Sequence, residues 1–366
     1  MNEPPLFDDV IWTEAARARG LSAHVPTGGV YLIPLDFAAI EAHLGDEVPL
    51  AEARSEHWLA GRAGDRKVLL RRAGSTAGCM VDVAFDPPLR LGLRMHSVGP
   101  PVTLGPPTVR DAFSIKIHDG RQIDALFAAT EEGRALAAEL VGMPLSFVRI
   151  SDSLFGLSLI TAPQGARSFL DLLDRALDLA AKIEAARAAM PAAPWEQALA
   201  RVFRKAGRRI GADLDPTRMT LSGELDGVPV SASAPMVEQA IATRVEARLD
   251  PPLGLGLSIG PEGAFPRLRA LMGLGDIQTG NAAFDRVFHV RGAPKEAVLL
   301  ALGEQAQKAL LTAHADEASV VVTDEKVEIV YPREMKEPEE LDRALIEAVS
   351  IARGLRATRT SGSPYR

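Results

Sequence analysis

The carboxylates of Asp86 and Asp250 are the first candidates for chemistry, because each stands directly before a pair of prolines in two otherwise similar segments. A carboxylate that recurs in this way could bind a ligand common to both segments. However, a proline disfavours the helical conformation in the residue before it, and an Asp side chain can hydrogen-bond the local backbone. We therefore interpret both aspartates as turn residues rather than as ligands.

The histidines, the cysteine and the glycines do not form a pattern typical of a catalytic or metal site. No two histidines have the i, i+4 spacing of a helical metal pair; they are His24, His43, His57, His96, His118, His289 and His314. Cys79 is the only cysteine, which excludes an internal disulfide and the thiolate zinc clusters. The glycines of "LGLGLSIG" lack the G-x-G-x-x-G spacing of dinucleotide sites. The sequence predicts no cofactor, no metal and no catalytic residue.

A basic cluster, "RVFRKAGRR", is the first of two candidate binding segments. Its central residues are Arg204, Lys205 and Arg208, flanked by Arg201 and Arg209. Such a cluster could contact an acidic partner protein or a phosphate group. The alternative, which the helical spacing favours, is the solvated side of a helix.

The second candidate segment is "TGNAAFDRVFHV" at 279–290, with Asn281 and Asp285 as its polar side chains. It resembles the TGD-x-x-FD-x-x-F-x-V stretch of a group of uncharacterised bacterial proteins, with Asn281 in place of the usual Asp. The resemblance implies a bacterial source and no particular activity. Physically, the segment predicts a turn in which Gly280 takes a positive φ, followed by a strand that phenylalanines anchor.

Four segments recur in the same order, which indicates an internal repeat. The clearest pair is "VDVAFDPPLRLGL" (81–93) and "VEARLDPPLGLGL" (245–257), identical at eight of thirteen positions. The segments at 173–183 and 341–351 share seven of eleven residues, and "VRISD" and "VVVTD" pair between these blocks. We expect two tandem diverged copies, at 1–190 and 191–366.

Each copy predicts an α+β domain with a mainly antiparallel sheet and two or three helices, the two copies packing as an internal pseudo-dimer. Strands include "LRLGLRM" and "LGLGLSI", and "SVVVTDEKVEIVY" (319–331) reads as a hairpin with Asp324–Lys326 at its turn. The shifting spacing between the repeats indicates an insertion at about 34–53 of the first copy. The tail at about 356–366 is predicted to be disordered.

The charge and hydropathy of the chain narrow the class of partner. A net charge of −7 and a pI near 5.6 disfavour nucleic acid, whose binding needs a positive excess. No apolar run approaches the ~18–20 residues of a membrane span, and the first residues lack the pattern of a secretory signal. These features favour a cytoplasmic protein.

The sequence favours a non-catalytic binding or protein-interaction module of a bacterial cytosol, without indicating its specificity. A groove between the two copies is the expected place for a partner protein or small ligand. Two alternatives stay open: an enzyme whose site is assembled from residues distant in sequence, and a structural subunit of a larger complex. The oligomeric state is not indicated.

Overall fold

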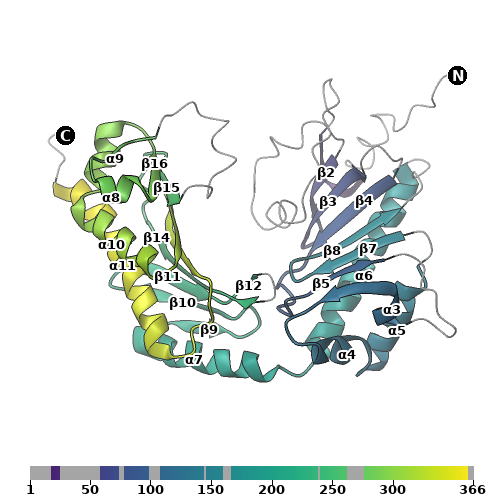
Figure 1. The fold of residues 1–366 in the computed structure, drawn as a ribbon. Helices are drawn as coiled ribbons and strands as arrows, with labels where there is room; N and C mark the ends of the chain where they lie inside the picture. Colours follow the sequence, from purple (N-terminus) through teal and green to yellow (C-terminus); the bar gives the residue numbers. More distant parts are fainter. Residues whose placement is uncertain are drawn as a thin grey trace, which may run out of the picture. The chain divides into compact units, whose positions relative to one another are not determined.

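The computed structural model divides the chain into two compact units, unit 1 (Met1–Pro191) and unit 2 (Ala192–Arg366). The residues whose structure is described are 18–24, 58–73, 78–98, 108–143, 146–159, 166–237, 240–261 and 276–361. The unit boundary lies one residue from the boundary expected between the copies. The expected insertion at 34–53 lies outside the described residues. In Figure 1, each unit combines helices with an antiparallel sheet.

Unit 1 contains an eight-stranded sheet in the order β1-β2-β3-β4-β8-β7-β5-β6, and all of its pairings are antiparallel. Its strands are β1 (Ser22–His24), β2 (Trp58–Ala63), β3 (Arg66–Ala73), β4 (Gly78–Ala84), β5 (Arg94–Ser97), β6 (Phe113–Lys116), β7 (Ser146–Ser151) and β8 (Leu154–Leu159). Its helices are α3 (Val109–Ala112), α4 (Arg121–Phe127), α5 (Glu131–Val141) and α6 (Ala166–Ala189).

Unit 2 contains a second eight-stranded antiparallel sheet, in the order β9-β10-β11-β14-β18-β17-β15-β16, and a short β12–β13 hairpin. Its strands are β9 (Asp213–Asp215), β10 (Thr220–Leu225), β11 (Val228–Ser233), β12 (Met236–Val237), β13 (Ala240–Ile241), β14 (Thr243–Arg248), β15 (Ser258–Pro261), β16 (Phe288–Arg291), β17 (Ser319–Thr323) and β18 (Lys326–Tyr331). Its helices are α7 (Pro194–Ile210), α8 (Ala282–Asp285), α9 (Lys295–Ala301), α10 (Glu304–Ala315) and α11 (Pro338–Ser361).

The two sheets have the same strand order along the chain. In each, four strands follow one another to the middle of the sheet, the next strand of the sheet in sequence lies three places further on, and the strand after it forms the edge. The final hairpin, β7–β8 or β17–β18, then fills the gap. The α+β class and the mainly antiparallel sheets are therefore as the sequence predicts.

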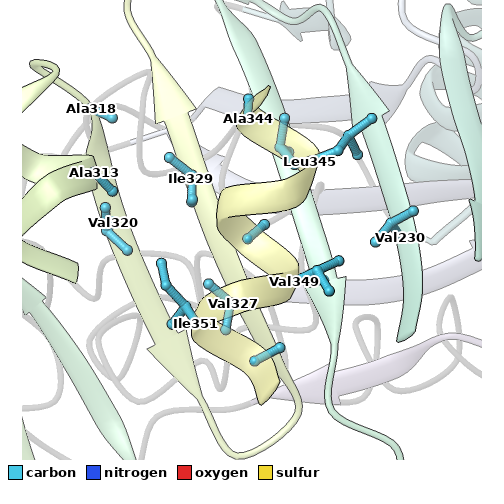
Figure 2. Close-up of a cluster of buried hydrophobic side chains, with 14 of the residues drawn as sticks. Val230, Ala313, Ala318, Val320, Val327, Ile329, Ala344, Leu345, Val349 and Ile351 are labelled. Carbon is cyan, nitrogen blue, oxygen red and sulfur yellow. The ribbon is translucent and has the colours of Figure 1, made fainter. Parts of the chain in front are cut away.

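One core holds unit 2 together. Alternate residues of β14 and β18, such as Val245, Val327 and Ile329, are fully buried and pack in one cluster with α7, α10 and α11. Figure 2 shows α11 crossing these strands, with Leu345 and Val349 directed at the sheet. The i, i+3, i+4, i+7 spacing of apolar residues on α11 places one side of the helix against the sheet. Unit 1 has its own core, formed by α3 to α6 and the alternate residues of its strands.

The number of helices exceeds the two or three that the sequence predicts for each copy: the described residues form four helices in unit 1 and five in unit 2. The stretch after residue 120 divides into α4 and α5, and Thr130 begins the second helix by accepting a hydrogen bond from Gly133 N at 3.0 Å. The corresponding stretch of unit 2 divides at Gly303, the residue before α10. Thr and Gly favour a helix start, which the apolar periodicity alone does not indicate.

The segments "LRLGLRM" and "LGLGLSI" were predicted as strands, but only their last residues are. Residues 89–93 form a loop, and β5 begins at Arg94. Arg90 and Gly92 have positive φ angles of 53° and 62°, as Gly254 and Gly256 do in unit 2 at 69° and 57°. A strand cannot accommodate left-handed residues at every second position. The leucines alternate because they point into the core from this loop.

The last helix extends further than the sequence predicts. Helix α11 runs to Ser361, so residues 356–361, expected to be disordered, are helical. The helix breakers Gly362 and Pro364 follow only after that residue. The predicted hairpin at 319–331 is confirmed: Val322 pairs with Val327 across a turn at Asp324 and Glu325.

Candidate functional site

The predicted basic cluster lies on the exposed side of α7. Arg204, Lys205 and Arg208 are all exposed, and their apolar neighbours face the core. The adjacent Arg209 forms ion pairs with Glu339 at 2.5 Å and Asp342 at 2.7 Å, at the start of α11. The solvated-helix interpretation accounts for these positions. A binding role for the cluster stays a prediction.

Asn281 and Asp285 hold a turn and a short helix together. The Asn281 side chain accepts hydrogen bonds from the first backbone amides of α8 and donates to Gln307 at 3.0 Å. The Asp285 carboxylate accepts from Thr279 N at 2.9 Å, Thr279 Oγ1 at 2.7 Å and Gly280 N at 3.1 Å. Although burial alone would raise the pKa of Asp285, these hydrogen bonds lower it.

The rest of this segment also follows the turn prediction. Gly280 has a φ of +85°, and Phe284 and Phe288 are buried and stacked with ring centroids 4.9 Å apart. The local hydrogen bonds and the stacking explain why these residue types are present. Ligand binding by Asn281 or Asp285 stays a prediction.

Two aspartates that each accept from three consecutive backbone amides were missed as candidates. Asp152 accepts from the amides of Leu91, Gly92 and Leu93 at 2.7, 2.8 and 3.2 Å. In unit 2, Asp324 accepts from Leu255, Gly256 and Leu257 at 3.0, 2.7 and 2.9 Å. The signal for this pair was the recurrence of "VRISD" and "VVVTD", which end in these residues.

These interactions explain the recurrence of the Asp-Pro-Pro segments. Asp86 and Asp250 are exposed at the bends that begin the two loops, and both Asp-Pro bonds are cis. Each loop is also bound by an arginine near the end of the unit's last helix. Arg187 donates to Leu89 O at 2.8 Å, and Arg356 donates to Asp250 O at 2.5 Å. The recurrent residues are therefore those that shape a loop.

A different arrangement of charge lies on the outer face of the unit 2 sheet, the face whose side chains alternate with the core residues. Arg244 and Glu246 on β14 lie beside Lys326 and Glu328 on β18, and we call these four residues the charged quartet. Lys326 Nζ lies 2.7 Å from Glu328 and 3.4 Å from Glu246, and Arg244 Nε lies 3.8 Å from Glu328. The side chains are between 19% and 43% exposed.

Within the charged quartet, Lys326 and Glu328 favour each other's charged forms. Burial alone would lower the pKa of Lys326, but the carboxylates of Glu328 and Glu246 raise it. Burial alone would raise the pKa of Glu328, but Lys326 and Arg244 lower it. The outer face therefore presents a fixed pattern of alternating charge at the centre of the sheet.

The outer face of unit 1 is built differently at the same positions. Asp82 and Arg149 form a buried ion pair there, with Arg149 Nε 3.1 Å from the Asp82 carboxylate. Val81 pairs with Leu157 as Val245 pairs with Ile329 in unit 2. By this register, Gly156 corresponds to Glu328. A Cβ atom on Gly156 would lie 2.4 Å from Arg149 Nε, so the guanidinium occupies the space that a side chain would need.

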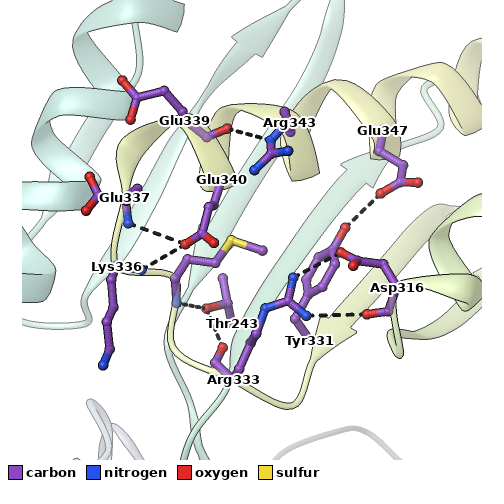
Figure 3. A network of polar contacts seen from close by, with 11 residues as sticks. Thr243, Asp316, Tyr331, Arg333, Lys336, Glu337, Glu339, Glu340, Arg343 and Glu347 are labelled. Carbon is purple, nitrogen blue, oxygen red and sulfur yellow. Dashed lines mark hydrogen bonds and ion pairs between the residues drawn. The ribbon is translucent and has the colours of Figure 1, made fainter.

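A second polar cluster in unit 2 joins the end of β18 to α10 and α11 (Figure 3). Tyr331 is buried, and its hydroxyl donates to Glu347 at 2.8 Å. Arg333 lies over the Tyr331 ring, 5.5 Å from its centroid, and binds Asp316 at 3.0 Å. Burial and the nearby Asp316 raise the pKa of Glu347, and burial also raises that of Tyr331.

Within the described ranges, no group of three or more His, Cys, Asp or Glu side chains is arranged to hold a metal ion. In the same ranges, no helix has the length and hydropathy needed to cross a membrane.

The comparisons with known proteins give one weak likeness. No protein-family profile matches the chain, and no curated protein matches it significantly. Among solved structures, the mycobacterial trehalose monomycolate transport factor TtfA aligns over 46% of this chain and 98% of its own. The identity is 13% and the TM-score is 0.29, which is too low to support an argument about fold or function.

Proposed function

We propose that the two units are diverged copies of one domain and that the chain is a non-catalytic module that binds a partner protein. Three features support the duplication: the identical strand order, the recurrent sequence segments, and the aspartate that binds three consecutive loop amides in each unit. Independent domains would not be expected to share a feature as specific as the Asp152 and Asp324 interactions. The proposed setting is the bacterial cytosol, as expected from the sequence.

The observation that carries the binding proposal is the charged quartet on the outer face of unit 2. Partly exposed ion pairs contribute little to folding stability, typically about 0–1 kcal/mol. Complementary charge patterns instead give an interface its specificity and its association rate. A fixed pattern at the centre of a broad, half-exposed sheet face is suited to recognition of a partner with the opposite pattern.

The test compares the wild-type protein with a variant whose quartet has exchanged signs: Arg244→Glu, Glu246→Lys, Lys326→Glu and Glu328→Lys. Each of the three ion pairs of the quartet keeps opposite charges, so the domain is expected to fold, whereas the pattern presented to a partner is reversed. The matched control exchanges the signs of three residues of unit 1, Glu139→Lys, Asp178→Lys and Lys182→Glu, because Lys182 Nζ lies 2.8 Å from Glu139 and 2.7 Å from Asp178. Wild type and both variants are expressed in the organism that the protein comes from, purified under non-denaturing conditions and measured by native mass spectrometry.

We expect wild type and control to retain a protein-sized additional mass, and the quartet variant to lose it. Retention by the quartet variant would contradict the assignment to the outer face. A wild-type ion of 39.1 kDa without additional mass would contradict stable partner binding. An additional mass of a few hundred daltons would instead favour the enzyme alternative, with a retained small ligand.

A further inference from the structure

Three hydrogen-bond donors lie in one row across the outer face of unit 2, near the edge of the sheet. Ser258 on β15 pairs directly with Arg291 on β16 and with Thr323 on β17. Their neighbours Ile259, Val290 and Val322 belong to the core. The side chains of Ser258, Arg291 and Thr323 therefore share the outer face. Opposite residues of an antiparallel pair have Cβ atoms about 4.5–5.5 Å apart, so one small group above Ser258 is within reach of all three.

The Ser258 hydroxyl has no hydrogen-bond partner among the described residues. Its side-chain oxygen is buried, and the residue is 9% exposed. A buried hydroxyl without a partner costs about 1–3 kcal/mol, so such groups are rare in folded proteins. This unpaired hydroxyl on the outer face offers a hydrogen bond to a bound group.

Arg291 and Thr323, the neighbours of Ser258, also have hydrogen-bond donors that no described residue accepts from. Arg291 is half-buried and forms no hydrogen bond or ion pair with any described residue. Thr323 Oγ1 accepts from the amides of Glu325 and Lys326, both at 3.3 Å, which leaves its O–H free to donate. The acids around this row have other partners: Glu246 and Glu328 are bound by Lys326, and Asp276 lies 3.1 Å from His289 Nδ1 and accepts from Val290 N at 2.9 Å.

We propose that Arg291, Ser258 and Thr323 form a binding site for an oxyanion, a phosphoryl or carboxylate group. The three side chains offer a guanidinium and two hydroxyl donors, and a planar guanidinium binds either group through two parallel hydrogen bonds. Arg291 is the only charged residue of the three, and its positive charge disfavours the binding of a cation. This inference deepens the proposed function, since the site lies on the same outer face as the charged quartet and specifies the chemistry recognised there.

The test titrates the purified full-length protein with inorganic phosphate and, separately, with acetate at constant ionic strength and pH. Amide and arginine side-chain signals are followed by NMR, with residues 258, 291 and 323 as reporters. The variants are Arg291→Gln and Ser258→Ala, and the matched control is Arg248→Gln. Arg248 lies in the same row, opposite Lys326, but lacks adjacent hydroxyl residues.

We expect saturable shifts at the three residues with one of the two anions, which also identifies the oxyanion as phosphoryl or carboxylate. Arg291→Gln should weaken binding at least about tenfold and Ser258→Ala about fivefold, while Arg248→Gln should leave it unchanged. Absence of saturable shifts with both anions, or equal weakening by Arg248→Gln, would overturn the site. Because no partner protein is present, this result is independent of the quartet test.

Discussion

At the scale of single residues, Asp324 makes the most specific contribution to unit 2. Its carboxylate accepts from three consecutive amides, and hydrogen bonds to a charged group are worth about 1.5–3 kcal/mol each before non-additivity. We expect Asp324→Ala to lower the free energy of unfolding by about 3 kcal/mol, measured by urea denaturation. Asp250→Asn serves as the control, because Asp250 is exposed and its change should stay within about 0.5 kcal/mol. A loss of similar size in both variants would contradict this role.

In unit 1, Gly156 is a residue whose substitution we expect to lower stability. A Cβ atom there would lie 2.4 Å from Arg149 Nε and 2.8 Å from the Asp82 carboxylate. Gly156→Ala should therefore separate a buried ion pair, which costs about 3–5 kcal/mol in the free energy of unfolding. Gly120→Ala is the matched control, because a Cβ atom at Gly120 meets nothing within 4 Å. Equal thermal stability of the two variants would show that the Asp82–Arg149 ion pair contributes little to the free energy of unfolding.

At this scale, the sequence predicts turns better than it predicts the hydrogen-bond partners of a side chain. Asp86, Asp250 and Gly280 were predictable because proline and glycine act through the local backbone. Asp152 and Asp324 were not, because a carboxylate gives no indication of which amides, about 60–70 positions away, will donate to it. The charged quartet was missed for the same reason, since its pairs depend on the register of β14 and β18.

At the scale of elements, the β18–α11 contact contains a group that titrates. Burial raises the pKa of Glu347 and Asp316 raises it further, while the hydrogen bond from Tyr331 opposes this shift. A raised pKa means that the folded state binds the proton more tightly than the unfolded state does. The stabilising effect of protonated Glu347 is thus fully present below the unfolded pKa and is lost as the pH rises through the folded pKa.

Glu347→Gln keeps an acceptor for Tyr331 but cannot ionise. We expect this variant to be more stable than wild type at pH 7, and the difference to shrink as the pH falls through the raised pKa of Glu347, reaching its minimum below the ordinary glutamate pKa. Chemical denaturation at several pH values measures the difference. The facing groups are Tyr331, Arg333 and Asp316, so Asp316→Asn should reduce the effect by lowering the pKa of Glu347. A difference that is constant with pH would assign the effect to packing.

Element boundaries were predictable only where a helix breaker or a turn residue marks them. The hairpin at 319–331 was correct because alternating valines flank a polar turn. The leucines of 89–93 alternate in the same way, yet left-handed Arg90 and Gly92 place them in a loop. Apolar residues at every second position therefore indicate which side chains are buried, but they do not show that the backbone is extended.

At the scale of the whole molecule, each unit has a complete core of its own. The core of unit 1 consists of residues between Leu21 and Met190, and that of unit 2 of residues between Leu199 and Leu355. Neither cluster contains a residue of the other unit. A domain with its own hydrophobic core can fold without its neighbour.

We therefore expect a fragment comprising Ala192–Arg366 to fold alone. It should show dispersed amide NMR signals and one cooperative unfolding transition, because its core needs no side chain from unit 1. Asp324→Ala in the fragment should reproduce the loss of stability that it causes in the full chain, since the three amides that it binds lie in the same unit. A fragment that remains unfolded, or in which Asp324→Ala has no effect, would show that unit 2 depends on unit 1 for its structure.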